Sequence, residues 1–162
     1  MKRETQLELA RVLQAYAHSG STALAPEVFR NPVSAYSAPG RAQRERDRLF
    51  RRQPLFVGLS CQLPKPGDYL AEEIAGVPVL LVRGQDGNLR AFANICRHRG
   101  APVASGCGHA RVFSCPYHGW TYGLDGTLAG IPEAASFPGV DKARHGLAPL
   151  PSGEKHGMIF VQ

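Results

Sequence analysis

The chain has 162 residues, of which 43% are hydrophobic and 20% are charged. These values are typical of one soluble globular domain and exclude global disorder. No apolar run approaches the roughly 18 residues that a membrane span requires, and Glu4 and Glu8 stand where a signal peptide would begin its apolar stretch. We therefore expect a cytoplasmic protein. The 18 Gly and 13 Pro residues favour short strands and turns over long helices.

The formal charge of +6 is concentrated in the first third of the chain. Residues 1–52 hold ten Lys or Arg against five Asp or Glu, whereas residues 53–162 hold nine against eight. The basic density is highest between Gly40 and Gln53, where Phe50 is the only aromatic residue. A single-stranded nucleic-acid site would interleave several aromatic residues for base stacking. We therefore interpret this stretch as a solvated amphipathic helix that offers a surface to an acidic partner.

The first 52 residues predict a helical arm. Residues 5–18 have apolar positions at helical spacing, with Thr5 as the expected N-cap and Gly20 as the stop; these positions are Leu9, Val12, Leu13 and Tyr16. Residues 19–40 are rich in Ser, Pro and Ala and predict an extended connector, with a single turn after Pro26. A second helix is expected over residues 41–52 and should end before Pro54.

From residue 53 onward the pattern becomes strand-like. Four longer strands are expected over residues 55–60, 69–74, 77–83 and 89–94, and three shorter ones over residues 111–115, 120–122 and 157–161. Turn residues separate them at Ala75-Gly76, Gln85–Asn88 and Asp125-Gly126. This part of the chain therefore predicts a mostly β domain.

Two Cys–His pairs lie in the middle of the β portion. Cys96-Arg97-His98 is followed, after sixteen residues, by Cys115-Pro116-Tyr117-His118. Thiolates and imidazoles together suit two kinds of metal centre. One is a structural zinc site with two Cys and two His ligands. The other is a [2Fe–2S] cluster in which two Cys bind one iron and two His bind the other.

The order of the four residues favours the cluster. In zinc fingers the two Cys come first and the two His follow. Here each segment supplies one Cys and one His, so each segment can reach both irons of a two-iron cluster. A site for a single ion would not need that arrangement.

The two segments, Asn94–Pro102 (NICRHRGAP) and Cys115–Tyr122 (CPYHGWTY), resemble the cluster loops of Rieske-type proteins, and more closely those of ring-hydroxylating oxygenase alpha subunits. The resemblance covers about residues 40–162 and is strengthened by the segments Leu124–Leu128 and Gly157–Val161. It implies a Rieske-type antiparallel β-sandwich with a small two-loop cluster-binding subdomain at about residues 94–122. We therefore expect an N-terminal helical arm and connector over residues 1–52 and a Rieske [2Fe–2S] domain over residues 53–162.

The resemblance also implies the site residues. The metal ligands would be Cys96, His98, Cys115 and His118, and they would hold one [2Fe–2S] cluster. Around the cluster we expect further contacts from Arg99, Gly100, Tyr117, Gly119 and Trp120, the glycines allowing tight turns and the aromatic residues shielding the site.

The remaining cysteines and histidines are assigned no ligand role. Respiratory Rieske proteins carry an extra cysteine in each loop, joined as a disulfide, and the matching residues here are Ala101 and Tyr117. The disulfide of the respiratory subtype therefore cannot form here, which argues against that subtype. Cys61 and Cys107 are expected to be free thiols, and His109 is expected to be a surface histidine.

The ligand set predicts the redox behaviour of the cluster. Two Fe³⁺, two sulfides and two thiolates carry no net charge when the imidazoles are neutral, and reduction gives −1. An all-thiolate cluster would go from −2 to −3 instead, so His ligation raises the potential into the range of about −150 to +300 mV. We expect a carrier that takes up one electron at a time.

The resemblance implies a place for that carrier in an oxygenase. The family's alpha subunits take electrons from a ferredoxin or flavin reductase and pass them to a mononuclear non-haem iron, often in a neighbouring subunit of a trimer. Two His and one carboxylate in a larger C-terminal catalytic domain hold that iron. This chain ends at Gln162, about where that domain would begin. We therefore expect a fragment of a mono- or dioxygenase alpha subunit, without catalytic residues of its own.

Two alternatives stay open. In the first, the chain is a short gene product that kept only the electron-transfer domain. In the second, it is a free-standing Rieske-type ferredoxin. Ferredoxins of this type resemble residues 54–162 and generally lack a helical arm, so residues 1–52 count against the second alternative. Neither a nucleic acid nor a membrane is expected as a partner.

Overall fold

Residues 77–83 form the central strand of the largest sheet because they are a nearly continuous apolar run. In the computed structural model, which describes residues 1–162, strand β3 (Val77–Arg83) is buried from Val79 onward. A strand that is apolar on both of its faces needs cover on both sides. Two separate sets of side chains provide that cover and make up the core of the domain.

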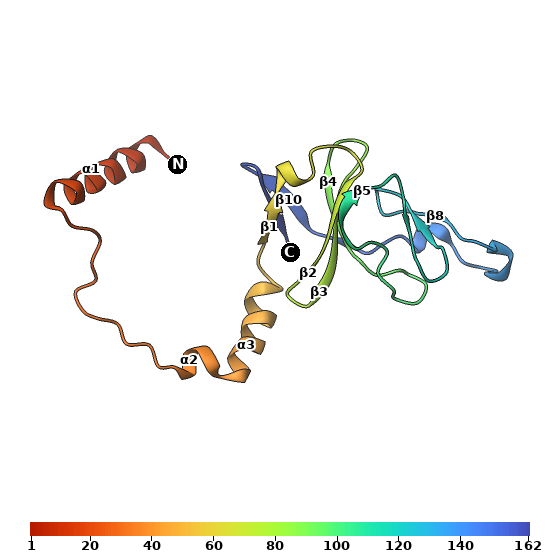
Figure 1. Ribbon diagram of the computed structural model, residues 1–162, viewed down its shortest axis with the longest axis horizontal. Helices are drawn as coiled ribbons and strands as arrows, with labels where there is room; N and C mark the ends of the chain where they lie inside the picture. The colour runs from red at the N-terminus through yellow and green to blue at the C-terminus, as the bar shows by residue number, and fades with distance from the viewer. The chain divides into compact units, whose positions relative to one another are not determined.

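The chain divides into two units, Met1–Ala38 and Pro39–Gln162. The first contains helix α1 (Arg3–Ser19) and the single helical turn α2 (Ser34–Ser37) (Figure 1). Helix α1 ends at Gly20, as the sequence predicts, because glycine adopts the left-handed conformation there with φ of 60°. No helix in the structure is long and apolar enough to cross a membrane.

Three details of the N-terminal elements differ from the sequence predictions. Helix α1 begins before the expected N-cap Thr5, and its N-cap Lys2 makes no side-chain hydrogen bond. The helical turn in the connector lies at α2, which follows Pro32, and not directly after Pro26. The helix expected over residues 41–52 consists of α3 (Pro39–Glu45) and a π-helical turn, η1 (Arg46–Phe50).

The second unit contains three antiparallel sheets. The five-stranded sheet has the order β5-β2-β3-β4-β9, and its strands besides β3 are β2 (Asp68–Ile74), β4 (Leu89–Ala93), β5 (Gly106–His109) and β9 (Pro149–Leu150). A three-stranded sheet has the order β1-β11-β10, from β1 (Leu55–Leu59), β10 (Ser152–Lys155) and β11 (Met158–Val161). A smaller sheet contains β6 (Phe113–Ser114), β7 (Thr121–Tyr122) and β8 (Leu128–Gly130). Short 3₁₀ turns occur at η2 (Ser60–Gln62), η3 (Ala134–Ser136) and η4 (Lys142–Arg144).

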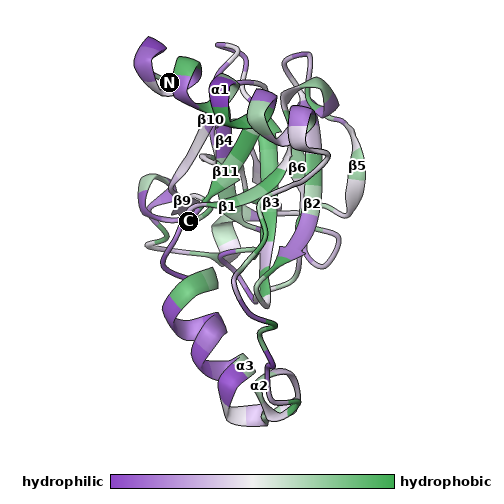
Figure 2. Ribbon diagram, turned by 90° about the vertical axis from the view of Figure 1, so that its left-hand side faces the viewer, coloured by the Kyte–Doolittle hydropathy of each residue, from purple (hydrophilic) through white to green (hydrophobic).

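Alternate residues of β3 belong to different cores, as the two-residue period of a strand requires. Val79 and Leu81 pack with Ile159 and Val161 of the three-stranded sheet. Leu80 and Val82 belong to the other cluster, which also contains residues of the segment from 96 to 128. Figure 2 shows the hydrophobic strands β3 and β11 in the interior of this unit and the mostly hydrophilic helix α3. The mostly β, antiparallel architecture confirms the fold class that the sequence predicts.

A partly buried ion pair joins the two larger sheets. Arg83 ends β3 and is 8% exposed, and its guanidinium donates two hydrogen bonds to the carboxylate of Glu154 on β10, at 2.5 and 2.6 Å. Arg83 also donates to the backbone oxygen of Leu63 at 2.9 Å. This bidentate contact fixes the packing of the sheets on the side away from residues 96–128.

The four longer strands lie where the sequence predicts them, whereas four other strands were not predicted. The strands expected over 55–60, 69–74, 77–83 and 89–94 appear as β1 to β4, with ends shifted by one residue at most. Both central residues of the Ala75-Gly76 turn have positive φ, 51° and 76°, which is the conformation of the tight hairpin turn that the sequence predicts. Strands β5, β8, β9 and β10 were not predicted from the sequence. All residues of β5 and β10 are exposed, so these strands carry no apolar alternation.

Candidate metal centre

Two loops of the second unit have the same backbone hydrogen bonds. In loop 1 (residues 94–105), the backbone N–H of Cys96 donates to the oxygen of Ala101 at 2.8 Å, and that of Gly100 donates to the oxygen of Cys96 at 2.9 Å. In loop 2 (residues 115–120), the N–H of Cys115 donates to the oxygen of Trp120 at 2.8 Å, and that of Gly119 to the oxygen of Cys115 at 2.9 Å. The two Cys–His pairs of the sequence therefore lie on matching tight turns.

A glycine makes each turn possible. Gly100 and Gly119 have φ of 78° and 71°, in the left-handed region that favours glycine. A Cβ at Gly119 would also lie 2.8 Å from a side-chain carbon of Pro132. The expected role of Gly100 and Gly119 as turn residues agrees with this geometry.

The sulfur atoms of both loops belong to the interior. Cys96 and Cys115 are 3% and 4% exposed and are members of the same apolar cluster. The hydroxyl oxygen of Tyr122 lies 3.3 Å from the Cys96 sulfur and accepts the backbone N–H of Arg97 at 2.9 Å. Burial and the contact with Cys96 raise the pKa of Tyr122, so the phenol keeps its proton.

The imidazoles of the two loops face each other. The rings of His98 and His118 are 4.7 Å apart, centre to centre. Nδ1 of His98 is buried and has no hydrogen-bond partner. Buried polar nitrogens in proteins almost always have a partner. A metal ion bound at Nδ1 would satisfy this atom.

Aromatic rings enclose His98. The indole of Trp120 stacks on its imidazole with centres 5.0 Å apart and an angle of 9° between the planes. Phe137 meets the imidazole edge-on at 5.4 Å. Burial, followed by the positive charges of His118 and Arg99, lowers the pKa of His98. The imidazole is therefore held neutral, which is the form that binds metals.

His118 has a different environment. Its side chain is exposed, and the ring of Tyr117, which is 59% exposed, covers it at a centre-to-centre distance of 3.8 Å. The two imidazoles are thus unequal, because His98 is enclosed and His118 faces solvent beside Tyr117.

The loops carry positive charge only. Arg97 and Arg99 of loop 1 are exposed, as is Arg111 between the loops, and no Asp or Glu occurs from residue 96 to residue 120. Figure 1 shows the basic helix α3 beside the β1 end of the same unit, whereas residues 94–122 lie on the other side of the five-stranded sheet. The arginines of the loops and those of α3 therefore form separate surfaces.

The donor set fits a two-iron cluster of the Rieske kind. Two buried thiols, one buried unpaired imidazole nitrogen and a second adjacent imidazole are the donors that such a cluster uses. No three His, Cys, Asp or Glu side chains lie close enough together to hold a single metal ion. Of the four predicted ligands, His98 and His118 lie next to each other, and Cys96 and Cys115 belong to one buried cluster. Arg99, Gly100, Tyr117, Gly119 and Trp120 lie on the same two loops.

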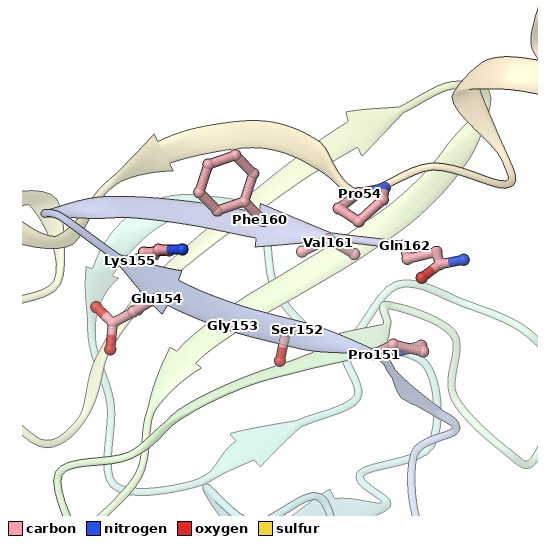
Figure 3. A pocket seen from close by; sticks show the side chains of 9 residues that line it. All are labelled: Pro54, Pro151, Ser152, Gly153, Glu154, Lys155, Phe160, Val161 and Gln162. Carbon is pink, nitrogen blue, oxygen red and sulfur yellow. The ribbon is translucent and has the colours of Figure 1, made fainter. Parts of the chain in front are cut away.

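The remaining candidates lie elsewhere. Cys61 and Cys107 are exposed and unpaired. His109 lies on β5 and contacts the carboxylate of Asp68 at 3.0 Å. The groove of about 350 Å³ shown in Figure 3 lies along the β10–β11 hairpin, between residues such as Pro54, Phe160 and Gln162, and contains neither Cys nor His.

Two residues of the site had no predicted role. Tyr122 contacts Cys96 across 26 residues of sequence, and Phe137 lies beyond both loops. The only signal for Tyr122 was its place at the end of the second motif, and Phe137 had none because its contact with His98 arises from the tertiary fold.

Comparisons with known proteins agree with this geometry. The model of the family described as "Rieske [2Fe-2S] domain" matches residues 53–152, more than half of the chain. The chain is 35% identical over 137 residues to the carnitine monooxygenase oxygenase subunit of Acinetobacter baumannii, covering 84% of this chain and 35% of the relative. It is 42% identical over 134 residues to the chlorobenzene dioxygenase subunit alpha of a Cupriavidus species, covering 82% of this chain and 30% of the relative. The chain thus spans about a third of the length of these relatives.

A solved structure shares the fold. The crystal structure of the apo form of a quaternary ammonium Rieske monooxygenase superposes with a TM-score of 0.76 at 34% identity, covering 82% of this chain and 39% of that one. The chain belongs to the Rieske [2Fe-2S] domain family, whose cluster has two Cys and two His ligands, and is homologous to the N-terminal portion of Rieske oxygenase alpha subunits.

Proposed function

We propose that residues 53–162 form an electron-transfer domain in which Cys96 and Cys115 bind one iron of the cluster and His98 and His118 bind the other. The observation that supports this assignment is the pair of matching loops, which carry two buried thiols and two adjacent imidazoles. Residues 1–52 are then a lead-in arm to this domain.

The side chains around the ligands prepare the site for electron transfer. A bound Rieske cluster supplies a one-electron couple. The aromatic rings of Trp120 and Phe137 exclude water from His98. A cluster-bound Cys96 would be a thiolate, which can only accept, so the O–H of Tyr122 would donate to its sulfur while the Tyr122 oxygen accepts the N–H of Arg97. Such a donor stabilises negative charge on sulfur and therefore favours the reduced state.

The electrons would pass from a reductase or ferredoxin to the mononuclear iron of an oxygenase catalytic domain. The names of the relatives support an oxygenase, since they are an oxygenase subunit and a dioxygenase alpha subunit. They act on carnitine and chlorobenzene, so we assign neither a substrate nor a choice between mono- and dioxygenation. Four unpaired thiols suit a reducing compartment, and we place the protein in the cytoplasm.

A reconstitution experiment tests this function. The cluster of the purified chain is reduced by an oxygenase reductase, and transfer to an added iron-loaded oxygenase catalytic domain is followed as oxidation of the cluster and formation of hydroxylated product. We expect the reductase to reduce the wild-type cluster by one electron at a time. His118→Ala should abolish this reduction. Turnover of an intact oxygenase that lacks its own ferredoxin would instead indicate a free-standing carrier.

A further inference from the structure

Loop 1 and loop 2 close by different means. Loop 2 lies between β6 and β7, which pair with each other through Ser114 and Thr121, so the backbone ladder holds its ends together. Loop 1 lies between β4 and β5, and the order β5-β2-β3-β4-β9 separates these strands by two others. No ladder therefore joins the two ends of loop 1.

The side chain of Asn94 joins them instead. Its Oδ1 accepts the backbone N–H groups of Val103 and Ala104, at 2.9 and 3.2 Å, and its Nδ2 donates to the oxygen of Ala104 at 2.8 Å. Asn94 is only 5% exposed. Its own backbone N–H donates to the oxygen of Pro78 at 2.8 Å, which anchors it to β3.

These bonds enclose the loop that carries two of the four proposed ligands. Residues 95–102 lie between the two ends that Asn94 connects, and they include Cys96 and His98. Resting on the function proposed above, we propose that Asn94 is a positioning residue, which takes the place of strand pairing and fixes Cys96 and His98 relative to the five-stranded sheet.

Asparagine suits this role because the site needs two functions from one short side chain. An amide offers an acceptor oxygen and a donor nitrogen in one plane. An aspartate at this position would keep the acceptor and lose the donor to Ala104. An alanine would lose both and would leave the buried N–H of Val103 without a partner, which carries a large desolvation cost.

The test compares matched variants of the holoprotein. Asn94→Ala removes the closure of loop 1, and Asn94→Asp keeps its acceptor half. Thr121→Val removes the hydroxyl contacts with Ser114 and Gly119 at the end of loop 2 but leaves the β6–β7 ladder in place. Ile159→Ala weakens the core on the opposite face of the sheet and controls for a general loss of stability.

Three readouts are measured at a temperature where circular dichroism shows each variant folded. They are the rate at which a chelator removes iron, the line width of the electron paramagnetic resonance (EPR) spectrum of the reduced cluster, and amide hydrogen exchange at Val103 and Ala104. We expect Asn94→Ala to release iron about 10-fold faster or more, with broadened EPR lines. Asn94→Asp should fall between Asn94→Ala and the wild type. Thr121→Val and Ile159→Ala should keep the wild-type rate and line width.

The outcomes separate this proposal from the function on which it rests. If Asn94→Ala releases iron at the wild-type rate and has the wild-type EPR line width, the role of Asn94 is overturned while the cluster assignment stays intact. A wild-type chain without iron would contradict the proposed function as well. If Asn94→Ala does not fold, the proposal is tested by amide hydrogen exchange in the wild type and in Asn94→Asp. Fast exchange of Val103 and Ala104 in the wild-type protein would then overturn the proposal, and slow exchange that Asn94→Asp accelerates would support it.

Discussion

The hydroxyl of Tyr122 lies 3.3 Å from the sulfur of Cys96, and its oxygen also accepts the backbone N–H of Arg97 at 2.9 Å. A thiolate sulfur can only accept a hydrogen bond, so with Cys96 deprotonated the O–H of Tyr122 is the donor in this contact. Tyr122 is fully buried, so no water competes for this contact. A residue of strand β7 thus reaches across to the first loop and acts on its cysteine.

Tyr122→Phe should lower the reduction potential of the cluster while preserving its iron content. The variant keeps the buried ring and loses only the O–H donor to Cys96. A difference of about 1 kcal/mol in that hydrogen bond between the oxidation states corresponds to roughly 40 mV for one electron. Redox titration followed by EPR measures the shift. An unchanged or raised potential would show that the O–H does not stabilise the reduced cluster.

Opening the aromatic enclosure of His98 should destabilise the domain and broaden the spectrum of the cluster. Trp120→Ala removes a ring that is 3% exposed and stacks on His98, and loss of such a side chain costs about 3–5 kcal/mol of unfolding free energy. Trp120→Phe keeps a ring at this position and should retain most of the stability. Thermal unfolding and EPR of the two variants provide the comparison. Equal stability and equal EPR line widths in Trp120→Ala and Trp120→Phe would contradict a role for the stacked ring.

The candidate metal site could be proposed from the sequence because its signals are local. Residue types and spacing within two short segments identify the four candidate ligands and the two turn glycines. The contacts around them could not be predicted in the same way. Phe137 reaches His98, and Tyr122 reaches Cys96, only after β7 and the 131–146 segment have packed against loop 1.

Dependence on contacts between distant parts of the chain also explains why some strands were not predicted. Strand β5 contains Gly106, Cys107, Gly108 and His109, all exposed, and it is a strand because β2 offers it a free edge. Strand β10 is exposed along its whole length and is held by β11 and by the Arg83–Glu154 pair. Pairing partners from distant sequence, and not an apolar pattern, define these two strands.

The Arg83–Glu154 pair predicts a loss of stability in acid. The hydrogen bond from Arg83 lowers the pKa of Glu154 below its ordinary value of 4.5. Since the folded pKa is depressed, the contribution is present above about pH 4.5, the unfolded value, and is lost as the pH falls through the folded pKa. Glu154→Gln should therefore reduce the free energy of unfolding by about 1–3 kcal/mol at neutral pH, and the difference should shrink in acid.

Urea unfolding at several pH values measures this dependence. Glu73→Gln is the matched control, since Glu73 is an exposed residue of β2 without an ion pair. A difference between the wild type and Glu154→Gln that persists unchanged into strong acid would contradict the assignment.

Reduction by an acidic donor protein should slow as salt is added, because the exposed cations of loop 1 raise the encounter rate at low ionic strength. Arg99→Gln should reduce both the rate at low salt and its salt dependence. Arg48→Gln changes the other basic surface, on the helix that the sequence analysis interprets as facing an acidic partner. If the loops are the docking surface, Arg48→Gln should leave both close to wild type. Stopped-flow reduction over a range of salt concentrations makes the comparison. If Arg48→Gln has the larger effect, the donor binds the basic helix and not the loops.

The most direct test of the account is to count iron and acid-labile sulfide in anaerobically purified protein and to record its absorption and low-temperature EPR spectra. We expect two irons and two sulfides per chain and a reduced-state signal of low average g value. Cys115→Ser should lose both metal and signal. A colourless protein that holds one zinc ion would contradict the electron-transfer function.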